Sequence, residues 1–238
     1  MLAQSVELSR PPSFTSLQIP AGKPLHNGPV QAGVAVSNAT LYRLASAAGV
    51  GSALILLVNA AKRSALIPTT DLTQLLAPFA EAMALGLITG LFLAFGRRAG
   101  RFGTVAFIVN FIALASLVGV EVVINLVFSR LPVTAITELR AGPLGIFLTV
   151  SSLLFLLGTL AFVVSLAIGR DVPRLPLALY FIGAMPIALR AFVPELALDL
   201  GLVILAAAIA WLAGWLWVST SAFDGNGAEG ETRSNTQH

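Results

Sequence analysis

Three polar residues of one apolar segment fall on a single side of the helix that the segment predicts. Asn110, Glu121 and Asn125 lie between residues 104 and 128, a stretch otherwise dominated by apolar residues. Eleven helical residues turn through about 1100°, so Glu121 returns to within about 20° of Asn110. Asn125 follows Glu121 by one turn on the same side. We expect this polar stripe to face protein or water.

Two further charged residues reach nearly the same level as Glu121. Counted from a common end of the predicted helices at about 1.5 Å per residue, Glu121 lies about 25 Å along, Glu81 about 24 Å and Arg190 about 21 Å. Guanidinium and carboxylate groups match as a bidentate pair, and their attraction strengthens in a low dielectric. The sequence therefore predicts that Arg190 pairs with Glu121, with Glu81 as the alternative partner.

The segments that carry these residues are long enough to cross a lipid bilayer. Of the 238 residues, 57% are apolar or aromatic and only 11% are charged, against about a quarter in soluble domains. Spanning the hydrocarbon takes about 17–25 residues. Six apolar stretches fit: 41–61, 75–95, 104–128, 144–168, 177–193 and 198–218. The predicted fold is an all-α, polytopic transmembrane helical bundle of six spans, with the lipid bilayer as its surroundings.

The two ends of the chain differ from the apolar middle. Residues 1–38 contain Pro11, Pro12, Pro20, Pro24 and Pro29 and no long apolar run, which is typical of a flexible tail. We therefore expect a flexible N-terminal tail at 1–38, a six-helix transmembrane domain at 39–218, and a flexible C-terminal tail at 219–238.

The distribution of Lys and Arg predicts the orientation, because cytoplasmic loops carry the excess of these residues. With the N-terminus inside, nine basic residues are cytoplasmic: Arg10, Lys23, Arg43, Arg97, Arg98, Arg101, Arg170, Arg174 and Arg233. Five lie on the opposite side: Lys62, Arg63, Arg130, Arg140 and Arg190. Arg outnumbers Lys, which favours a GC-rich bacterial genome. The prediction is a multi-pass protein of the cytoplasmic (inner) membrane with both termini cytoplasmic.

The intramembrane polar cluster, Glu121, Arg190, Glu81, Asn110 and Asn125, has two interpretations. Ionisable groups in hydrocarbon cost about 2.5–3.5 kcal/mol each on insertion scales, so their presence needs a reason. In the structural interpretation, the Arg190–Glu121 pair fixes the order of the helices. In the functional interpretation, these residues line a small outward-facing cavity that binds a solute or a proton.

A stripe of small residues in the second span predicts a close helix contact. Ala82, Gly86, Gly90 and Ala94 recur every four residues, and small side chains let helix backbones approach each other in lipid. The stripe packs either inside the bundle or against another chain. A homo-oligomer or another membrane protein is thus left open as a partner.

The sequence lacks the residues of most enzymes. There is no Cys, and the only histidines, His26 and His238, lie in the polar tails. A Ser/His pair, a His-rich metal site and a phosphate-binding Gly-Lys loop are all missing. We expect no catalytic residue, no metal ligand, no cofactor and, with a net charge of only +3, no nucleic-acid partner.

From residue 41 to 218 the layout resembles small multi-pass bacterial membrane proteins that are grouped as a domain of unknown function. The likeness is carried by Leu41-Tyr42-Arg43-Leu44-Ala45 and by the segment from Gly158 to Trp217, which includes Gly169-Arg170, Val172-Pro173-Arg174, Ala188-Leu189-Arg190 and Ala210-Trp211-Leu212-Ala213-Gly214-Trp215. Ser219-Thr220 stands where those proteins often place a basic residue. The resemblance implies an integral membrane protein and assigns no active site.

Two functions follow from these observations. The first is a non-catalytic, membrane-embedded binding, sensing or scaffolding component. The second is a secondary transporter of a small solute, or a proton-coupled one, that uses Glu121, Asn110 and Arg190. Transporters commonly have spans that are broken by Pro or Gly in matched positions of the two halves. Few spans of this chain are broken in that way, which counts against the second function.

Overall fold

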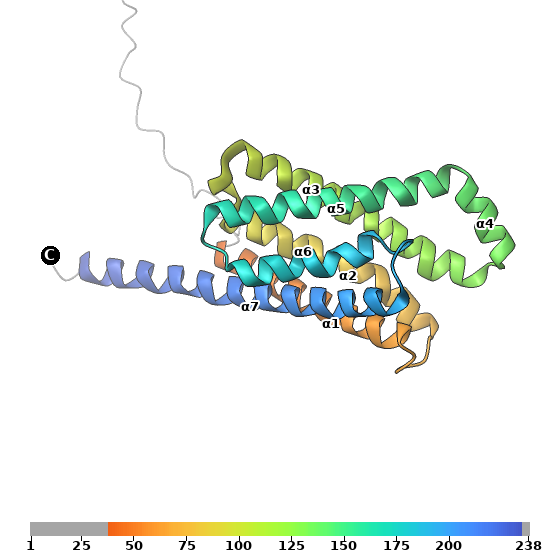
Figure 1. Ribbon diagram of the computed structural model, residues 1–238. Helices are drawn as coiled ribbons and strands as arrows, with labels where there is room; N and C mark the ends of the chain where they lie inside the picture. The colour runs from red at the N-terminus through yellow and green to blue at the C-terminus, as the bar shows by residue number, and fades with distance from the viewer. Residues whose placement is uncertain (1–37, 235–238) are drawn as a thin grey trace, which may run out of the picture. The chain divides into compact units, whose positions relative to one another are not determined.

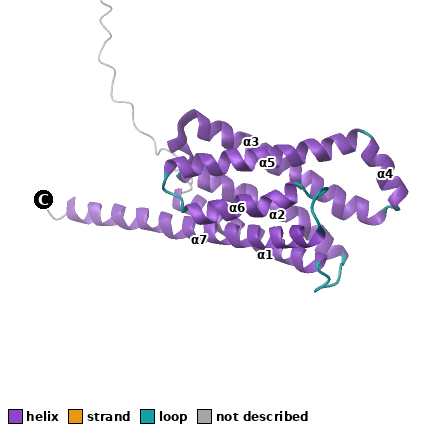
Figure 2. Ribbon diagram, in the orientation of Figure 1, coloured by secondary structure: helices purple, strands orange, loops and turns teal. Residues whose placement is uncertain are grey.

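The computed structural model describes the backbone of residues 38–234 and the side chains of residues 38–219. In this range helices are joined by short turns and loops and there is no strand, which confirms the all-α prediction (Figures 1 and 2). The elements are α1 (Asn38–Arg63), α2 (Asp71–Ala94), η1 (Gly96–Ala99), α3 (Gly100–Val122), η2 (Val123–Val127), η3 (Phe128–Arg130), α4 (Val133–Ala141), α5 (Pro143–Gly169), α6 (Arg174–Ala188) and α7 (Glu195–Ser234).

Five helical segments are long and apolar enough to cross a membrane. They are Asn38–Arg63, Asp71–Ala94, Gly96–Arg130, Pro143–Gly169 and Glu195–Ser219. A chain with this set of helices is suited to embedding in a bilayer. Helix α1 ends with Lys62 and Arg63. Helix α2 begins at Asp71 after a capping box between Thr70 and Thr73, in which each side chain accepts a hydrogen bond from the backbone N–H of the other residue.

The fifth predicted span, 177–193, is wrong in its bounds. Helix α6 has 15 residues and ends at Ala188, so it is about 22 Å long, whereas the hydrocarbon core is about 30 Å thick. Pro186 lacks a backbone donor in the last turn, and Pro194 disfavours helical geometry at the residue before it. Arg190 therefore lies in the turn between α6 and α7 and not within a helix.

The predicted tails fall partly outside the described range. Residues 1–37 and 235–238 lie outside the described residues, and Asn38 is the first residue of α1. At the other end, the backbone of α7 continues to Ser234, so 219–234 is a helical extension of the last span. Adding residues to an existing helix is far cheaper than nucleating a new one, which explains the extension.

Small residues bring the helices of the unit Val36–His238 close together, and the closest helix pairs are α1 with α2 and α7, α6 with α7, and α3 with α5. A Cβ added to Gly183 of α6 would lie 2.5 Å from the backbone nitrogen of Leu205 in α7. A Cβ on Gly158 of α5 would lie 3.0 Å from Cα of Asn110 in α3. Such contacts are possible only for residues without a side chain.

The small-residue stripe of α2 packs in part inside the bundle. A Cβ on Gly86 would lie 3.0 Å from Cβ of Ala48, and one on Gly90 would collide with Cβ of Ala45, both on α1. Ala82 is exposed, and Ala94 is partly buried. The two glycines therefore form the α1–α2 seam of the same chain.

Candidate functional site

A polar cavity of about 60 Å³ lies at the end of the bundle where α1 ends and α7 begins. We call it the ionic pocket. Helices α1, α3, α6 and α7, the π-helical turn η2 and the turn after α6 supply its wall. Its lining residues are Asn59, Lys62, Arg63, Glu121, Ile124, Asn125, Ile187, Arg190, Leu198 and Leu202.

Glu121 is the buried anion of the ionic pocket. Arg190 donates from Nη1 to Glu121 Oε1 at 3.1 Å, and Asn125 donates from Nδ2 to Glu121 Oε2 at 2.7 Å. The exposed fraction is 7% for Glu121 and 25% for the Arg190 side chain. The carboxylate is therefore inside, while the guanidinium reaches the mouth of the pocket. This is the pairing that the sequence analysis expected.

The π-helical turn η2 positions Asn125. Its Nδ2 also donates to the Glu121 carbonyl at 3.0 Å, while its Oδ1 accepts from Lys62 Nζ at 2.8 Å. In a π-helical turn the backbone hydrogen bonds join residues five apart instead of four. The Ser129 hydroxyl donates to the Asn125 carbonyl at 2.5 Å. Single π-helical turns are frequent at functional sites. Asn125 thus connects the ammonium of Lys62 to the carboxylate of Glu121.

Arg63 joins the end of α1 to the first turns of α7. Its Nε donates to Asp199 Oδ1 at 3.1 Å, and its Nη2 also forms an ion pair with Glu195. Acidic side chains are stabilised at a helix N-terminus, where the peptide dipoles place partial positive charge. Since Glu195 and Asp199 are one turn apart, they hold the guanidinium from the same side of α7.

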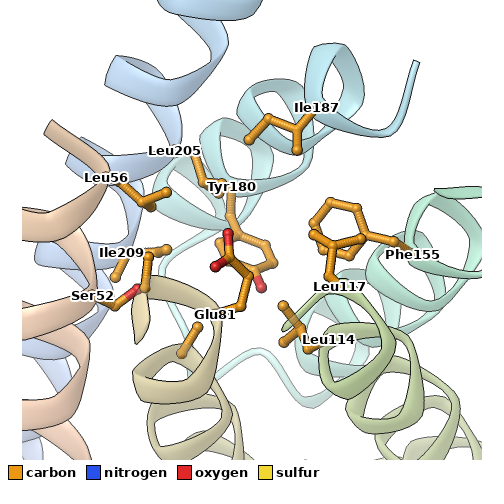
Figure 3. A pocket seen from close by; sticks show the side chains of 12 residues that line it. Ser52, Leu56, Glu81, Leu114, Leu117, Phe155, Tyr180, Ile187, Leu205 and Ile209 are labelled. Atoms are coloured by element: carbon orange, nitrogen blue, oxygen red, sulfur yellow. The ribbon is translucent and has the colours of Figure 1, made fainter. Parts of the chain in front are cut away.

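A second, smaller cavity of about 20 Å³ lies next to the ionic pocket, and we call it the inner cavity (Figure 3). It is lined by Ser52, Leu56, Ala80, Glu81, Ala84, Leu114, Leu117, Phe155, Tyr180, Ile187, Leu205 and Ile209. Glu81 is 8% exposed, and its Oε2 has no hydrogen-bond partner among the described residues. Ile187 lines both cavities, so they share a wall.

Asn110 lies apart from the two cavities. It is fully buried, and its Oδ1 accepts a hydrogen bond from Thr159 Oγ1 at 3.2 Å across the α3–α5 contact. The predicted polar stripe is therefore divided. Glu121, Asn125 and Arg190 meet in the ionic pocket, Glu81 lies in the inner cavity, and Asn110 lines neither cavity.

Sequence reasoning missed three residues of the ionic end of the bundle. Lys62 and Arg63 entered only the count of basic residues for the orientation, and Asp199 was not among the predicted site residues. The signal was present: adjacent cations close one predicted span, and Glu195 and Asp199 follow each other by four residues at the start of another. Side chains at that spacing share one face of a helix.

The ionic pocket is equipped to hold charge, and its wall carries no metal site. The described residues contain no group of three or more His, Cys, Asp or Glu side chains that could hold a metal ion. Lys62 uses one of its three N–H donors on Asn125, and Arg190 uses one of its five on Glu121. The remaining donors are available to an anion.

Comparison with known proteins found no match. No protein-family model, curated protein or solved structure is significantly similar to the chain.

Proposed function

We propose that the protein is a non-catalytic, multi-pass component of the cytoplasmic membrane that binds a small anion in the ionic pocket. Two observations support this proposal: the sequence has no Cys and only two His, His26 and His238, and five of the described helices have the length and composition of membrane spans. Helix α6 is too short for a full span, and the turn that carries Arg190 follows it directly.

The arginine-rich turns support an orientation. Arg97 and Arg98 of η1 and Arg170 and Arg174 around the α5–α6 turn lie at the end of the bundle opposite the ionic pocket, because α2 and α5 both run from the ionic end to these turns. The positive-inside rule assigns the arginine-rich end to the cytoplasm. The ionic pocket then opens toward the outer side of the membrane, and both termini are cytoplasmic.

The observation that carries the proposal is the convergence of unused cationic donors on one cavity. Lys62 and Arg190 both line the ionic pocket, and each makes a single hydrogen bond among the described residues. One bound water needs about 10–15 Å³ of such space, so about 60 Å³ holds a few waters or one small monovalent anion. Hydrogen bonds from an ammonium or a guanidinium to an anion are stronger than neutral ones.

Thermal unfolding of the protein in lipid nanodiscs tests the proposal, with chloride and acetate as probes at constant ionic strength. A ligand that binds only the folded state stabilises it by about 2.7 kcal/mol at a hundredfold excess over Kd. We expect a saturable rise in melting temperature for the wild type and none for Lys62→Gln. Arg130→Gln is the matched control, because Arg130 is exposed and pairs with Asp71 outside the pocket. An equal rise in Lys62→Gln, or none in the wild type, would contradict the proposal.

A second function, proton-linked transport of the same anion, is favoured by one observation. Glu81 is a buried carboxyl in a cavity that shares a wall with the ionic pocket. Intramembrane carboxyls are common in proton relays of transporters. Proteoliposomes loaded with a pH-sensitive dye test it: a chloride gradient acidifies the lumen if the protein moves protons with the anion, and leaves the lumen unchanged if the protein only binds the anion.

A further inference from the structure

We propose that the inner cavity is a proton-binding site, in which Glu81 carries the proton and exchanges it with Glu121 of the ionic pocket through water. Nothing in the anion-binding role requires this site. The inference rests on the proposed function only in taking the ionic pocket as the side that meets water.

The surroundings of Glu81 favour a neutral carboxyl. The side chain is 8% exposed, and its Oε2 has no hydrogen-bond partner among the described residues. Figure 3 shows the carboxyl group pointing into the inner cavity, which is lined mainly by apolar side chains. A buried carboxylate without a partner is strongly disfavoured, and such a group accepts a proton instead of remaining charged.

No lining residue of the inner cavity supplies a positive charge to neutralise Glu81. Helix α1 contributes Ser52, α6 contributes Tyr180, α5 contributes Phe155, and α7 contributes Leu205 and Ile209, with no cation among these lining residues. None of these side chains carries a charge at neutral pH.

The charged groups near Glu81 belong to the ionic pocket and make their contacts there. Glu81 lies within electrostatic range of Glu121 and Arg190, and those two pair with each other. Lys62 donates to Asn125. Among the described residues, neither Arg190 nor Lys62 forms an ion pair with Glu81.

The inner cavity has room for the carrier that a proton path needs. Its volume of about 20 Å³ accommodates one water, which requires about 10–15 Å³. In the transfer step the O–H bond at Glu81 Oε2 breaks and this water accepts the proton. Because Glu121 lines the ionic pocket and not the inner cavity, the first water gives one of its protons to a water of the ionic pocket, and that second water gives one of its own to a Glu121 oxygen. The negative charge moves from Glu121 to Glu81, so atoms and charge balance.

One hydroxyl group is in place to hold the charge that this step leaves on Glu81. Ser52 lines the same cavity from α1 and is labelled beside Glu81 in Figure 3, whereas the Tyr180 side chain of α6 is hydrogen-bonded to Asn110. The Ser52 hydroxyl oxygen, like Glu81 Oε2, has no hydrogen-bond partner among the described residues. A hydroxyl can rotate to donate to a newly formed carboxylate.

Infrared spectroscopy of the protein in nanodiscs tests the proton on Glu81. A protonated carboxylic acid has its own carbonyl stretching band, which shifts when H₂O is replaced by D₂O. We expect this band at neutral pH in the wild type, its loss in Glu81→Gln, and its retention in Glu138→Gln, where an exposed carboxyl on α4 is removed. Absence of the band from the wild type, or its persistence in Glu81→Gln, would overturn the proposal.

The rate of deuteration of the same band tests the route through Glu121. Glu121→Gln should keep the band but slow its shift in D₂O by about a hundredfold, the range for losing a positioned proton-transfer group. The double variant Glu121→Gln/Arg190→Gln gives the same test without an unpaired Arg190, should the single variant fold poorly. An unchanged exchange rate would overturn the route. Anion binding by thermal shift should be intact in Glu81→Gln, so the failure of either proposal is recognised separately.

Discussion

Arg190 Nη1 lies 3.1 Å from Glu121 Oε1, and this contact joins the turn after α6 to the last helical turn of α3. The two residues are 69 positions apart in the chain. Because α6 is short, its end brings a guanidinium to the level of a buried carboxylate. The ion pair thus depends on where a helix stops as much as on the residues themselves.

The pair should be strongly coupled in unfolding experiments. Removing one partner of a buried ion pair leaves an uncompensated charge, which typically costs 3–5 kcal/mol. Since the Arg190 side chain is 25% exposed, we expect about 1–3 kcal/mol of destabilisation for Glu121→Gln or Arg190→Gln alone.

The double variant decides whether this cost reflects the pair. Glu121→Gln/Arg190→Gln should recover much of the folded yield in detergent that each single variant loses. Additive losses would show that the two side chains act independently.

Asn125 should matter more than its neighbour Asn59, although both line the ionic pocket. Asn125 makes hydrogen bonds to Lys62 and Glu121, whereas Asn59 makes none among the described residues. Leaving buried polar groups unsatisfied costs about 1–3 kcal/mol. Chemical denaturation should therefore show that loss for Asn125→Ala and little change for Asn59→Ala; equal effects would argue against the bridging role.

Gly183 should tolerate no side chain, while Gly214 should accept one. A Cβ at Gly183 meets the Leu205 backbone nitrogen at 2.5 Å, whereas a Cβ at Gly214 meets nothing within 4 Å. Overpacking typically costs about 1–3 kcal/mol, so Gly183→Ala should lower the melting temperature. Gly214→Ala should leave it unchanged or raise it, since Ala favours helix over Gly by about 1 kcal/mol. A stable Gly183→Ala protein would contradict the close α6–α7 contact.

Sequence patterns predict the helices well and their ends poorly. The apolar runs identify the five long spans because period and length are local properties. The end of α6 at Ala188 depends on Pro186, Pro194 and the packing of Gly183 against α7, which no local pattern combines.

The candidate site was predictable only where a charge stood alone inside an apolar run. Glu121, Arg190 and Glu81 attract notice for that reason. Lys62 lies at the border of a span, where a cation is ordinary, and its contact with Asn125 across 63 residues depends on the helix arrangement. The separation of Asn110 from the rest of the polar stripe also depends on the helix arrangement, because Asn110 is hydrogen-bonded to Thr159 on another helix, α5.

The orientation can be read by labelling, because the chain has no Cys of its own. Thr137→Cys on α4 and Arg97→Cys on η1 both place a thiol at an exposed position. With intact cells and a membrane-impermeant maleimide, we expect the first to react and the second to react only after permeabilisation. The reverse pattern would place the ionic pocket on the cytoplasmic side.

The most direct test of the anion site is a crystal structure of the protein grown in bromide. Bromide replaces chloride or another small anion and is located by its anomalous scattering. The account predicts an anomalous peak in the ionic pocket within hydrogen-bond distance of Lys62 Nζ and the Arg190 guanidinium. Water alone in that cavity, with bromide elsewhere or absent, would contradict it.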